Sequence, residues 1–197
     1  MAANETPLNL LLAEYSALKS EQAQRIGFRD NLLYVTLGVF GAIVSFAVAK
    51  PDHYPALLLV PWVCLILGWT YIVNDQKISA LGRYIRYTLT VRARELAAPE
   101  LTAPESIQRE GDDETRAALF GWETAHRSDP HRERRKLEQL VIDQVTFVIS
   151  GIIALVSFWV LTPAAPLSLR ILAGVELLLL VILGLEIVIY ADLARGR

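Results

Sequence analysis

Residues 171–191 read ILAGVELLLLVILGLEIVIYA, and this stretch decides the fold class. Apart from Glu176 and Glu186, every side chain in it is uncharged, and most are large and apolar. At about 1.5 Å of rise per residue, a helix of this length covers roughly 30 Å, the thickness of the hydrocarbon core of a bilayer. The stretch therefore predicts a transmembrane helix.

Three further stretches have the same character and contain no charged residue: Asn31–Ala49, Pro55–Val73 and Gln144–Thr162. Short proline-bearing links join the four spans in pairs, Lys50–Tyr54 in the first pair and Pro163–Arg170 in the second. None of the runs alternates as barrel strands do, and backbone polar groups in a bilayer must otherwise be satisfied within helices. The sequence predicts an all-α, polytopic membrane protein with four transmembrane helices in two hairpins and additional cytoplasmic amphipathic helices.

The composition agrees with a membrane protein whose charges are segregated. Of 197 residues, 53% are hydrophobic, and the charged ones gather before the first span, between the hairpins and at the end. The single cysteine, Cys64, lies in an apolar run, so no internal disulfide can form. Met1–Asp30 has no early apolar core with a cleavage site, so we expect the first span to act as its own insertion signal.

These features divide the chain into five parts. They are an N-terminal amphipathic helix (1–30), a first hairpin (31–73), a helical region (74–140), a second hairpin (141–191) and a tail (192–197). Two apolar stripes at helical spacing lie outside the spans. The first is Leu8, Leu11, Leu12, Tyr15 and Leu18, and the second is Ile78, Leu81, Ile85, Leu89 and Leu96. We expect the second stripe to continue the second span or to lie on the membrane surface.

Lysine and arginine residues predict the orientation. Of the 19 in the chain, only Lys50 and Arg170 lie in the hairpin links, and the other 17 lie in the two terminal segments or between the hairpins. Basic residues flanking spans are retained on the cytoplasmic side. We therefore expect a protein of the cell inner (plasma) membrane with both termini and the middle region in the cytoplasm.

Polar groups in or beside the spans are the first candidates for function. Glu176 and Glu186 lie inside the fourth span, where an ionised carboxylate costs several kcal/mol unless it faces protein or water. They either line an ion pathway or make local contacts, Glu176 between helices and Glu186 at the surface. Acids also stand at the predicted cytoplasmic ends of the four spans. These acids are interfacial caps paired with Arg29, Lys77 or Arg135, or they form a cation-concentrating ring at a pore mouth. They are Asp30, Asp75, Asp143 and Asp192.

Small residues at helical spacing predict close helix packing, either between the hairpins of one chain or between chains of an oligomer. One set lies in the first span and another in the third. The two sets are Gly38, Gly41, Ala42 and Ser45, and Ser150, Gly151, Ala154 and Ser157. Pro61 is expected to loosen the second span locally, as a bend or a gate.

The middle region offers surfaces for lipid or protein partners. Phe120 and Trp122 are candidate anchors for a cytoplasmic protein, since aromatic residues dominate interface energetics. Basic residues near the spans are candidates for binding anionic headgroups. They are Lys77, Arg83, Arg86, Arg134 and Arg135. Because acids interleave with these bases, we expect no nucleic acid partner. Glu123, His126, Asp129 and His131 do not complete a ligand set, so no metal or other cofactor is expected, and no residue pattern indicates an enzyme.

Three segments carry a resemblance to other proteins. Residues 21–34 (EQAQRIGFRDNLLY), 68–86 (GWTYIVNDQKISALGRYIR) and 122–129 (WETAHRSD) resemble uncharacterised actinobacterial multi-pass membrane proteins. The order of a two-span hairpin and a basic helix is similar, in architecture alone, to SLATT-type membrane modules. That second resemblance implies a pore-forming effector of bacterial conflict or antiphage defence, although this chain has two hairpins and no attached nucleotide-sensing domain.

Together these features favour one function and leave one alternative. The leading hypothesis is a homo-oligomeric membrane channel or pore-forming effector gated through its cytoplasmic helices. The alternative is a non-catalytic membrane scaffold that docks a cytoplasmic partner through Leu8–Ile26 and Thr115–His131.

Overall fold

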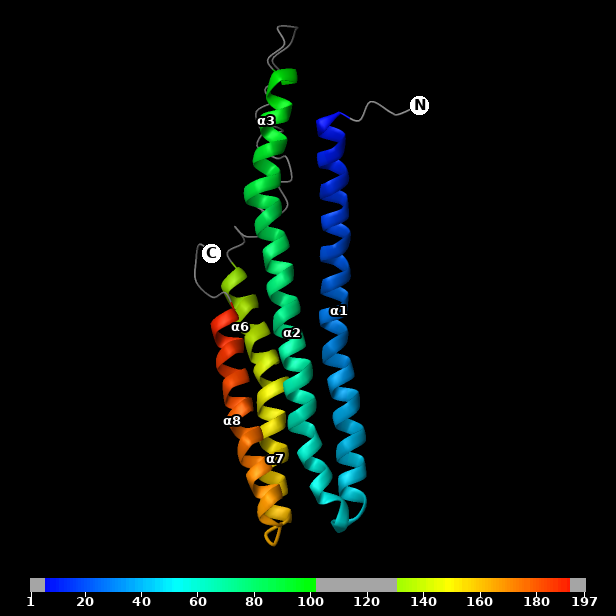
Figure 1. Ribbon diagram of the computed structural model, residues 1–197, viewed down its shortest axis with the longest axis vertical. Helices are drawn as coiled ribbons and strands as arrows, with labels where there is room; N and C mark the ends of the chain where they lie inside the picture. Colours follow the sequence, from blue (N-terminus) through cyan, green and yellow to red (C-terminus); the bar gives the residue numbers. More distant parts are fainter. Residues whose placement is uncertain (1–5, 102–130, 192–197) are drawn as a thin grey trace. The chain divides into compact units, whose positions relative to one another are not determined.

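The computed structural model describes residues 6–101 and 131–191, and every regular element in these ranges is a helix (Figure 1). Four helices are long and apolar enough to cross a membrane. The prediction of an all-α multi-pass membrane protein is therefore confirmed at this level. The four are α1 (Pro7–Ala49), the helix that includes α2 (Leu59–Tyr84), the helix that includes α7 (Ser150–Leu161), and α8 (Leu167–Tyr190).

Shorter helical segments extend the second and third of these helices. A 3₁₀ segment, η1 (Pro51–Leu58), precedes α2, while a π-helical segment, η2 (Ile85–Leu89), and α3 (Thr90–Leu101) follow it. On the other side of the sequence gap, α6 (Arg132–Asp143) and the π-helical η3 (Gln144–Ile149) run into α7. The second apolar stripe thus continues the second span in an unbroken helical path, one of the two arrangements that the sequence left open.

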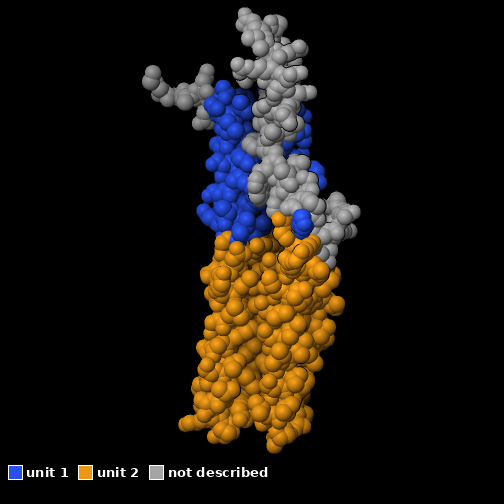
Figure 2. All heavy atoms as spheres, turned by 180° about the vertical axis from the view of Figure 1, so that it is seen from behind, with its two compact units in different colours: residues 1–26, 77–132 blue, residues 27–76, 133–197 orange. Residues whose placement is uncertain are grey.

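The chain forms two compact units, coloured separately in Figure 2. Unit 1 comprises residues 1–26 and 77–132, and unit 2 comprises residues 27–76 and 133–197.

The core of unit 2 is built by α2, η3 with α7, and α8, which meet where side chains are small. A Cβ atom on Gly68 of α2 would lie 2.8 Å from Leu183 Cδ2 and 3.3 Å from Phe147 Cβ. A Cβ on Gly151 of α7 would lie 2.8 Å from Leu180 Cδ1. At both places an added Cβ would press on side chains that are completely buried, namely Leu183 and Phe147 at Gly68 and Leu180 at Gly151.

In unit 2, α1 is the least covered of the four helices. Only 17% of its most apolar window is buried, against 50% for the helix that includes α2. Its inward side holds the buried residues Leu32, Thr36 and Ala47, and the Thr36 hydroxyl donates to the Leu32 carbonyl at 2.7 Å. The remaining surface of this helix in the unit is largely exposed.

The first link is more regular than the sequence indicated. Lys50 has an extended backbone and precedes η1, which begins at Pro51 and holds Pro55 in its interior. The α-helix proper starts only at Leu59, so Pro61 stands in its first turn. Pro61 therefore does not bend the middle of the span.

Unit 1 is a pair of helical segments held by an apolar cluster. Leu11 of α1, Leu89 of η2 and Ala93 of α3 are buried together, and Tyr15, Leu18 and Tyr84 pack against them. The Tyr84 hydroxyl donates to Glu14 Oε1 at 2.7 Å. Of the stripe predicted in residues 8–18, Leu11, Tyr15 and Leu18 therefore pack in this cluster, whereas Leu8 is half-buried outside it and Leu12 is exposed.

Each π-helical segment is followed by a residue with a hydroxyl side chain, which donates a hydrogen bond back to a carbonyl of the segment's wider turn. The backbone N–H of Thr90 donates to the Ile85 carbonyl, and the Thr90 hydroxyl donates to the same oxygen at 2.8 Å. Ser150 repeats the arrangement with the Val145 carbonyl, also at 2.8 Å from its hydroxyl. The hydroxyl thus supplies a second donor where the helix is wider than an α-helix, a feature often found at functional positions.

Candidate functional site

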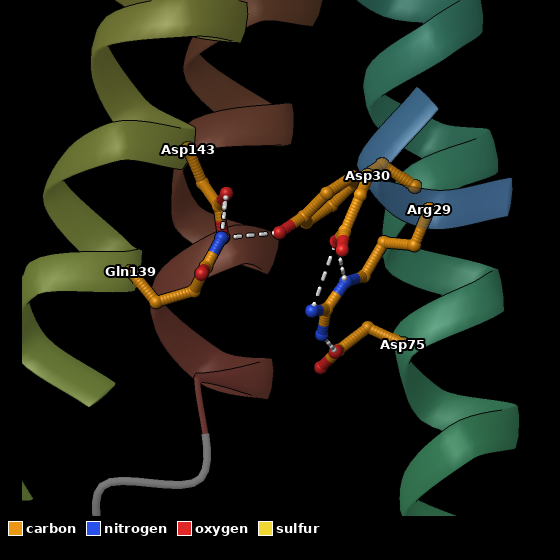
Figure 3. A network of polar contacts seen from close by, with 6 residues as sticks. Arg29, Asp30, Asp75, Gln139 and Asp143 are labelled. Carbon is orange, nitrogen blue, oxygen red and sulfur yellow. Dashed lines mark hydrogen bonds and ion pairs between the residues drawn. The ribbon is translucent and has the colours of Figure 1, made fainter. Parts of the chain in front are cut away.

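A network of polar side chains joins three helices at one end of unit 2 (Figure 3). On its first side, Arg29 of α1 donates to Asp75 of α2 through Nη1 at 2.8 Å. The same guanidinium donates to its neighbour Asp30 through Nε at 3.2 Å and Nη2 at 3.1 Å. Arg29 therefore bridges two of the acids that the sequence placed at the span ends.

On its second side, the network joins α2 to α6. The Gln139 side-chain amide donates both to the Tyr71 hydroxyl and to Asp143 Oδ1, the latter at 2.8 Å. Arg29 also lies over the Tyr71 ring, with its Cζ atom 5.9 Å from the ring centroid. A continuous set of polar contacts thus runs from α1 through α2 to α6.

A small cavity opens beside this network. It has a volume of about 30 Å³ and is lined by Asp75, Asp143 and Tyr71 together with Ile187 and Tyr190 of α8, as well as Ile72 and Ala191. A water molecule needs roughly 10–15 Å³ of such volume, so one or two waters fit. Two carboxylates therefore border a water-sized space at one end of the three-helix core.

The predicted acids have different surroundings. Asp143 is buried at 7% exposure, whereas the Asp30 side chain is 53% exposed and the Asp75 side chain 27%. Only Asp75 and Asp143 line the cavity, while Asp30 pairs with Arg29. Asp192 lies outside the described residues.

Glu176 lies in the interior of unit 2, on the buried face of α8. Its exposure is 0%, and neither carboxylate oxygen has a hydrogen-bond partner among the described residues. The other buried residues of α8 share its face at helical spacing and are all apolar or glycine. They are Ala173, Leu180, Leu183, Gly184 and Ile187. Trp62 of α2 is the neighbouring side chain with a polar hydrogen, and its N–H falls outside hydrogen-bond geometry.

Glu186 is placed differently from Glu176. Its side chain is half-buried on another face of α8, ten residues further along the same helix. Two residues before it, the Gly184 carbonyl accepts a hydrogen bond from the Gln144 side chain of η3 at 2.8 Å. The two glutamates therefore do not share one local environment.

An apolar plug separates the cavity from Glu176. We use this name for Leu180, Leu183 and Phe147, which are fully buried and fit against Gly151 and Gly68. From Glu176 to Ile187 at the cavity, α8 advances by about 16 Å at about 1.5 Å per residue. The core thus carries a water-sized acidic space, an apolar stretch and a buried carboxyl in series along α8.

The two predicted sets of small residues differ in how far they are buried. Gly151 and Ala154 are buried in the core of unit 2, and Ser150 and Ser157 are half-buried beside them. The first-span set is exposed, and a Cβ added to Gly38 or Gly41 would have no atom within 4 Å in the structure. That first-span set is Gly38, Gly41, Ala42 and Ser45.

The basic candidates also differ. Lys77 and Arg83 are exposed, and Arg134 forms an exposed ion pair with Glu138 at 2.9 Å. Arg86 lies over the Tyr87 ring at 4.1 Å from its centroid, and its buried Nε has no hydrogen-bond partner in the described part of the chain. Arg135 makes a polar or electrostatic interaction of its own. Phe120 and Trp122 lie outside the described residues.

Sequence reasoning did not single out Tyr71 and Gln139. The available signal was spacing, because Tyr71 stands four residues before Asp75, and Gln139 stands four residues before Asp143. Residues four apart share a helix face, so each acid had a polar neighbour on its own side. Which two faces meet depends on tertiary packing, and no local pattern supplies that.

Comparisons with family models, curated proteins and solved structures find no match for this chain. Within residues 6–101 and 131–191, no group of three or more His, Cys, Asp or Glu side chains is arranged to hold a metal ion. The fold and the polar groups of the core are therefore the basis for any functional proposal.

Proposed function

We propose that the protein is a homo-oligomeric membrane channel whose ion pathway runs through the core of unit 2 in each protomer. The observation that carries the proposal is the complete burial of Glu176 without a hydrogen-bond partner. Glu176 lies on the same buried face of α8 as Ile187, which lines the cavity beside Asp75 and Asp143. We therefore place the pathway along this face. The distribution of lysine and arginine supports a cytoplasmic position for both termini in this proposal.

Energetics argue against a purely structural role for Glu176. Removing an ionised carboxylate from water costs several kcal/mol, and only a partner or a bound cation offsets that cost. An apolar residue at this position would pack on Ala173 and Leu180 without any such cost. A polar group that destabilises the fold where it stands is typical of a transport site in a membrane protein.

The plug accounts for gating in this proposal. Hydrophobic constrictions close channels by excluding water, and Leu180, Leu183 and Phe147 form such a constriction between the cavity and Glu176. In this proposal, the packed arrangement of the three plug residues is the closed state. Both α1 and α2 contribute residues to each of the two units. We therefore propose that the signal that opens the channel acts on the helix pair of unit 1, which is held together by Leu11 and Leu89.

Oligomerisation belongs to the proposal because of the open face of α1. Gly38, Gly41, Ala42 and Ser45 are exposed and leave room for the backbone of another helix. Small residues at this spacing let two transmembrane helices approach closely. Because Glu176 is enclosed within one chain, the pathway lies inside each protomer, and the oligomer supports it from outside.

The test is cation flux from liposomes containing the purified protein. Leu183→Ala removes part of the plug and is expected to raise flux without any trigger, while Glu176→Gln is expected to lower it in that background. Glu186→Gln is the matched control, since it removes the same charge from a half-buried position of the same helix. Absence of flux from folded, inserted wild-type and Leu183→Ala protein would overturn the channel proposal.

A specific observation favours the scaffold as the second candidate function. Unit 1 exposes large apolar side chains, including Leu10 at 55%, Tyr87 at 59% and Val91 at 47%. Such residues outside the apolar spans are suited to docking a partner protein. A scaffold would keep its function in the Glu176→Gln variant, whereas a channel would not. The defence role implied by the SLATT-type resemblance has no support beyond that resemblance.

A further inference from the structure

The surroundings of Glu176 restrict the cation that this position can bind. Its neighbours one turn away on the buried face of α8 are Ala173 and Leu180, which offer no oxygen ligand. Among the described residues, no charged side chain acts on the carboxyl from α2, η3, α7 or α8, and Trp62 offers an N–H donor instead of an oxygen. On the buried face of α8 the two Glu176 carboxylate oxygens are the only side-chain oxygens, because the other buried residues of that helix are apolar or glycine, and neither oxygen has a hydrogen-bond partner among the described residues.

Metal cations need more oxygen ligands than the two that the Glu176 carboxylate provides. Hard cations such as Mg²⁺ and Ca²⁺ take about six to eight oxygen ligands, and potassium filters replace the hydration shell with rings of carbonyl oxygens. One carboxylate in a dry apolar site cannot replace a hydration shell. A proton binds to a single carboxylate oxygen by one O–H bond and needs no shell, and it also removes the charge whose burial is costly.

We propose that the ion conducted is the proton and that Glu176 is its binding site within the membrane. This inference rests on the proposed channel function and names its ion. When water enters between Leu180, Leu183 and Phe147, a hydronium ion from the Asp75–Asp143 cavity transfers its proton along the water to a Glu176 carboxylate oxygen. An O–H bond forms on the carboxyl as one breaks on water. The proton then leaves to water on the opposite side, which restores the carboxylate, and nothing is oxidised or reduced.

The first test measures which ion crosses. Leu183→Ala protein is placed in liposomes that contain a pH-sensitive dye, and a potassium gradient with valinomycin sets the membrane potential. Sodium flux is followed in parallel vesicles. Acidification is expected from Leu183→Ala, with a rate lowered by about tenfold or more when Glu176→Gln is added. Glu176→Asp is expected to restore much of the rate, and Glu186→Gln to leave it unchanged.

The possible outcomes distinguish a failure of the proton assignment from a failure of the channel proposal. Sodium flux with no change of internal pH overturns the proton assignment and leaves the channel proposal standing. Proton flux that Glu176→Gln does not lower overturns the role of Glu176. If no ion crosses at all, the channel proposal falls, and proton binding is then judged by infrared spectroscopy of the folded protein. A carboxylic-acid carbonyl band that is lost in Glu176→Gln but present in Glu186→Gln supports the site, and absence of that band at every pH overturns it.

Discussion

The side chain of Leu183 lies so close to the backbone of Gly68 that a Cβ atom at residue 68 would stand 2.8 Å from Leu183 Cδ2. Neither neighbour can give way easily, because Leu183 and Phe147 are both fully buried and Phe147 Cβ would be 3.3 Å from the same point. This contact joins α2, η3 and α8 at the level of the plug. The fit at Gly151 is equally close, since a Cβ there would lie 2.8 Å from Leu180 Cδ1, so added volume at either glycine crowds the core.

Gly68→Ala is therefore expected to destabilise the protein by about 1–3 kcal/mol, the usual cost of overpacking a filled core. Gly41→Ala is the matched control, since a Cβ there meets no atom within 4 Å and alanine favours helix by about 1 kcal/mol. Denaturant titration in detergent micelles measures both. Equal stability of the two variants would mean that the helices do not pack at Gly68 as described.

The polar network predicts a second difference in stability. Gln139→Leu removes the donor shared by Tyr71 and Asp143 and leaves the buried Asp143 carboxyl without that partner. A loss of about 1–3 kcal/mol is expected, because the hydrogen bond from Gln139 to the Asp143 carboxyl is lost and only the contact of that carboxyl with the Tyr71 hydroxyl remains. The change is measured by the same titration.

The control for the network is one residue away. Glu138→Gln breaks only the exposed ion pair with Arg134, and exposed pairs at this spacing contribute about 0.3–0.5 kcal/mol. If Glu138→Gln costs as much as Gln139→Leu, the Tyr71–Gln139–Asp143 contacts do not stabilise the core.

How much of this arrangement the sequence predicts depends on the residue. Four apolar runs predicted four spanning helices because length and composition alone fix that property. The inward face of α8 was not predictable, since the helix is apolar on all sides and carries no amphipathic signal. For the same reason Glu176 and Glu186 had to be considered together, although only Glu176 is enclosed. Small residues likewise marked Gly41 and Gly151 equally, and only the packed structure separates the open one from the covered one.

Cys64 provides a native probe of the plug. Its Sγ atom would lie 3.3 Å from a Cβ on Gly151, beside Leu180, and the side chain is fully buried. In the wild-type protein we expect almost no labelling by a small charged thiol reagent, because the core is dry. In Leu183→Ala we expect labelling at least about tenfold faster, since the plug then admits water and the reagent needs a thiolate in water. Mass spectrometry of the single cysteine measures the rate.

The probe also locates the pathway. A channel that conducts in Leu183→Ala while Cys64 stays unlabelled would place the ion path outside the three-helix core, between protomers. Gly151→Ala offers a comparison, because its added Cβ crowds Leu180 and Cys64 without removing plug volume. It is expected to leave Cys64 unlabelled, provided that circular dichroism shows the variant folded.

The open face of α1 predicts how protomers meet. The test uses a Cys64→Ala background, in which a single cysteine is introduced by Gly38→Cys or Ser45→Cys. Both positions lie on the exposed face of α1, and a Cβ on Gly38 would have no atom of another described helix within 4 Å. Two such helices packed through their small residues bring these positions into disulfide range. Oxidation in membranes is therefore expected to give a dimer band for both variants. Ala47→Cys is the matched control on the same helix, since Ala47 is fully buried on the inward side and is expected to stay uncross-linked. Equal cross-linking at all three positions would indicate random collision, and none at Gly38 or Ser45 would remove α1 as the contact between protomers.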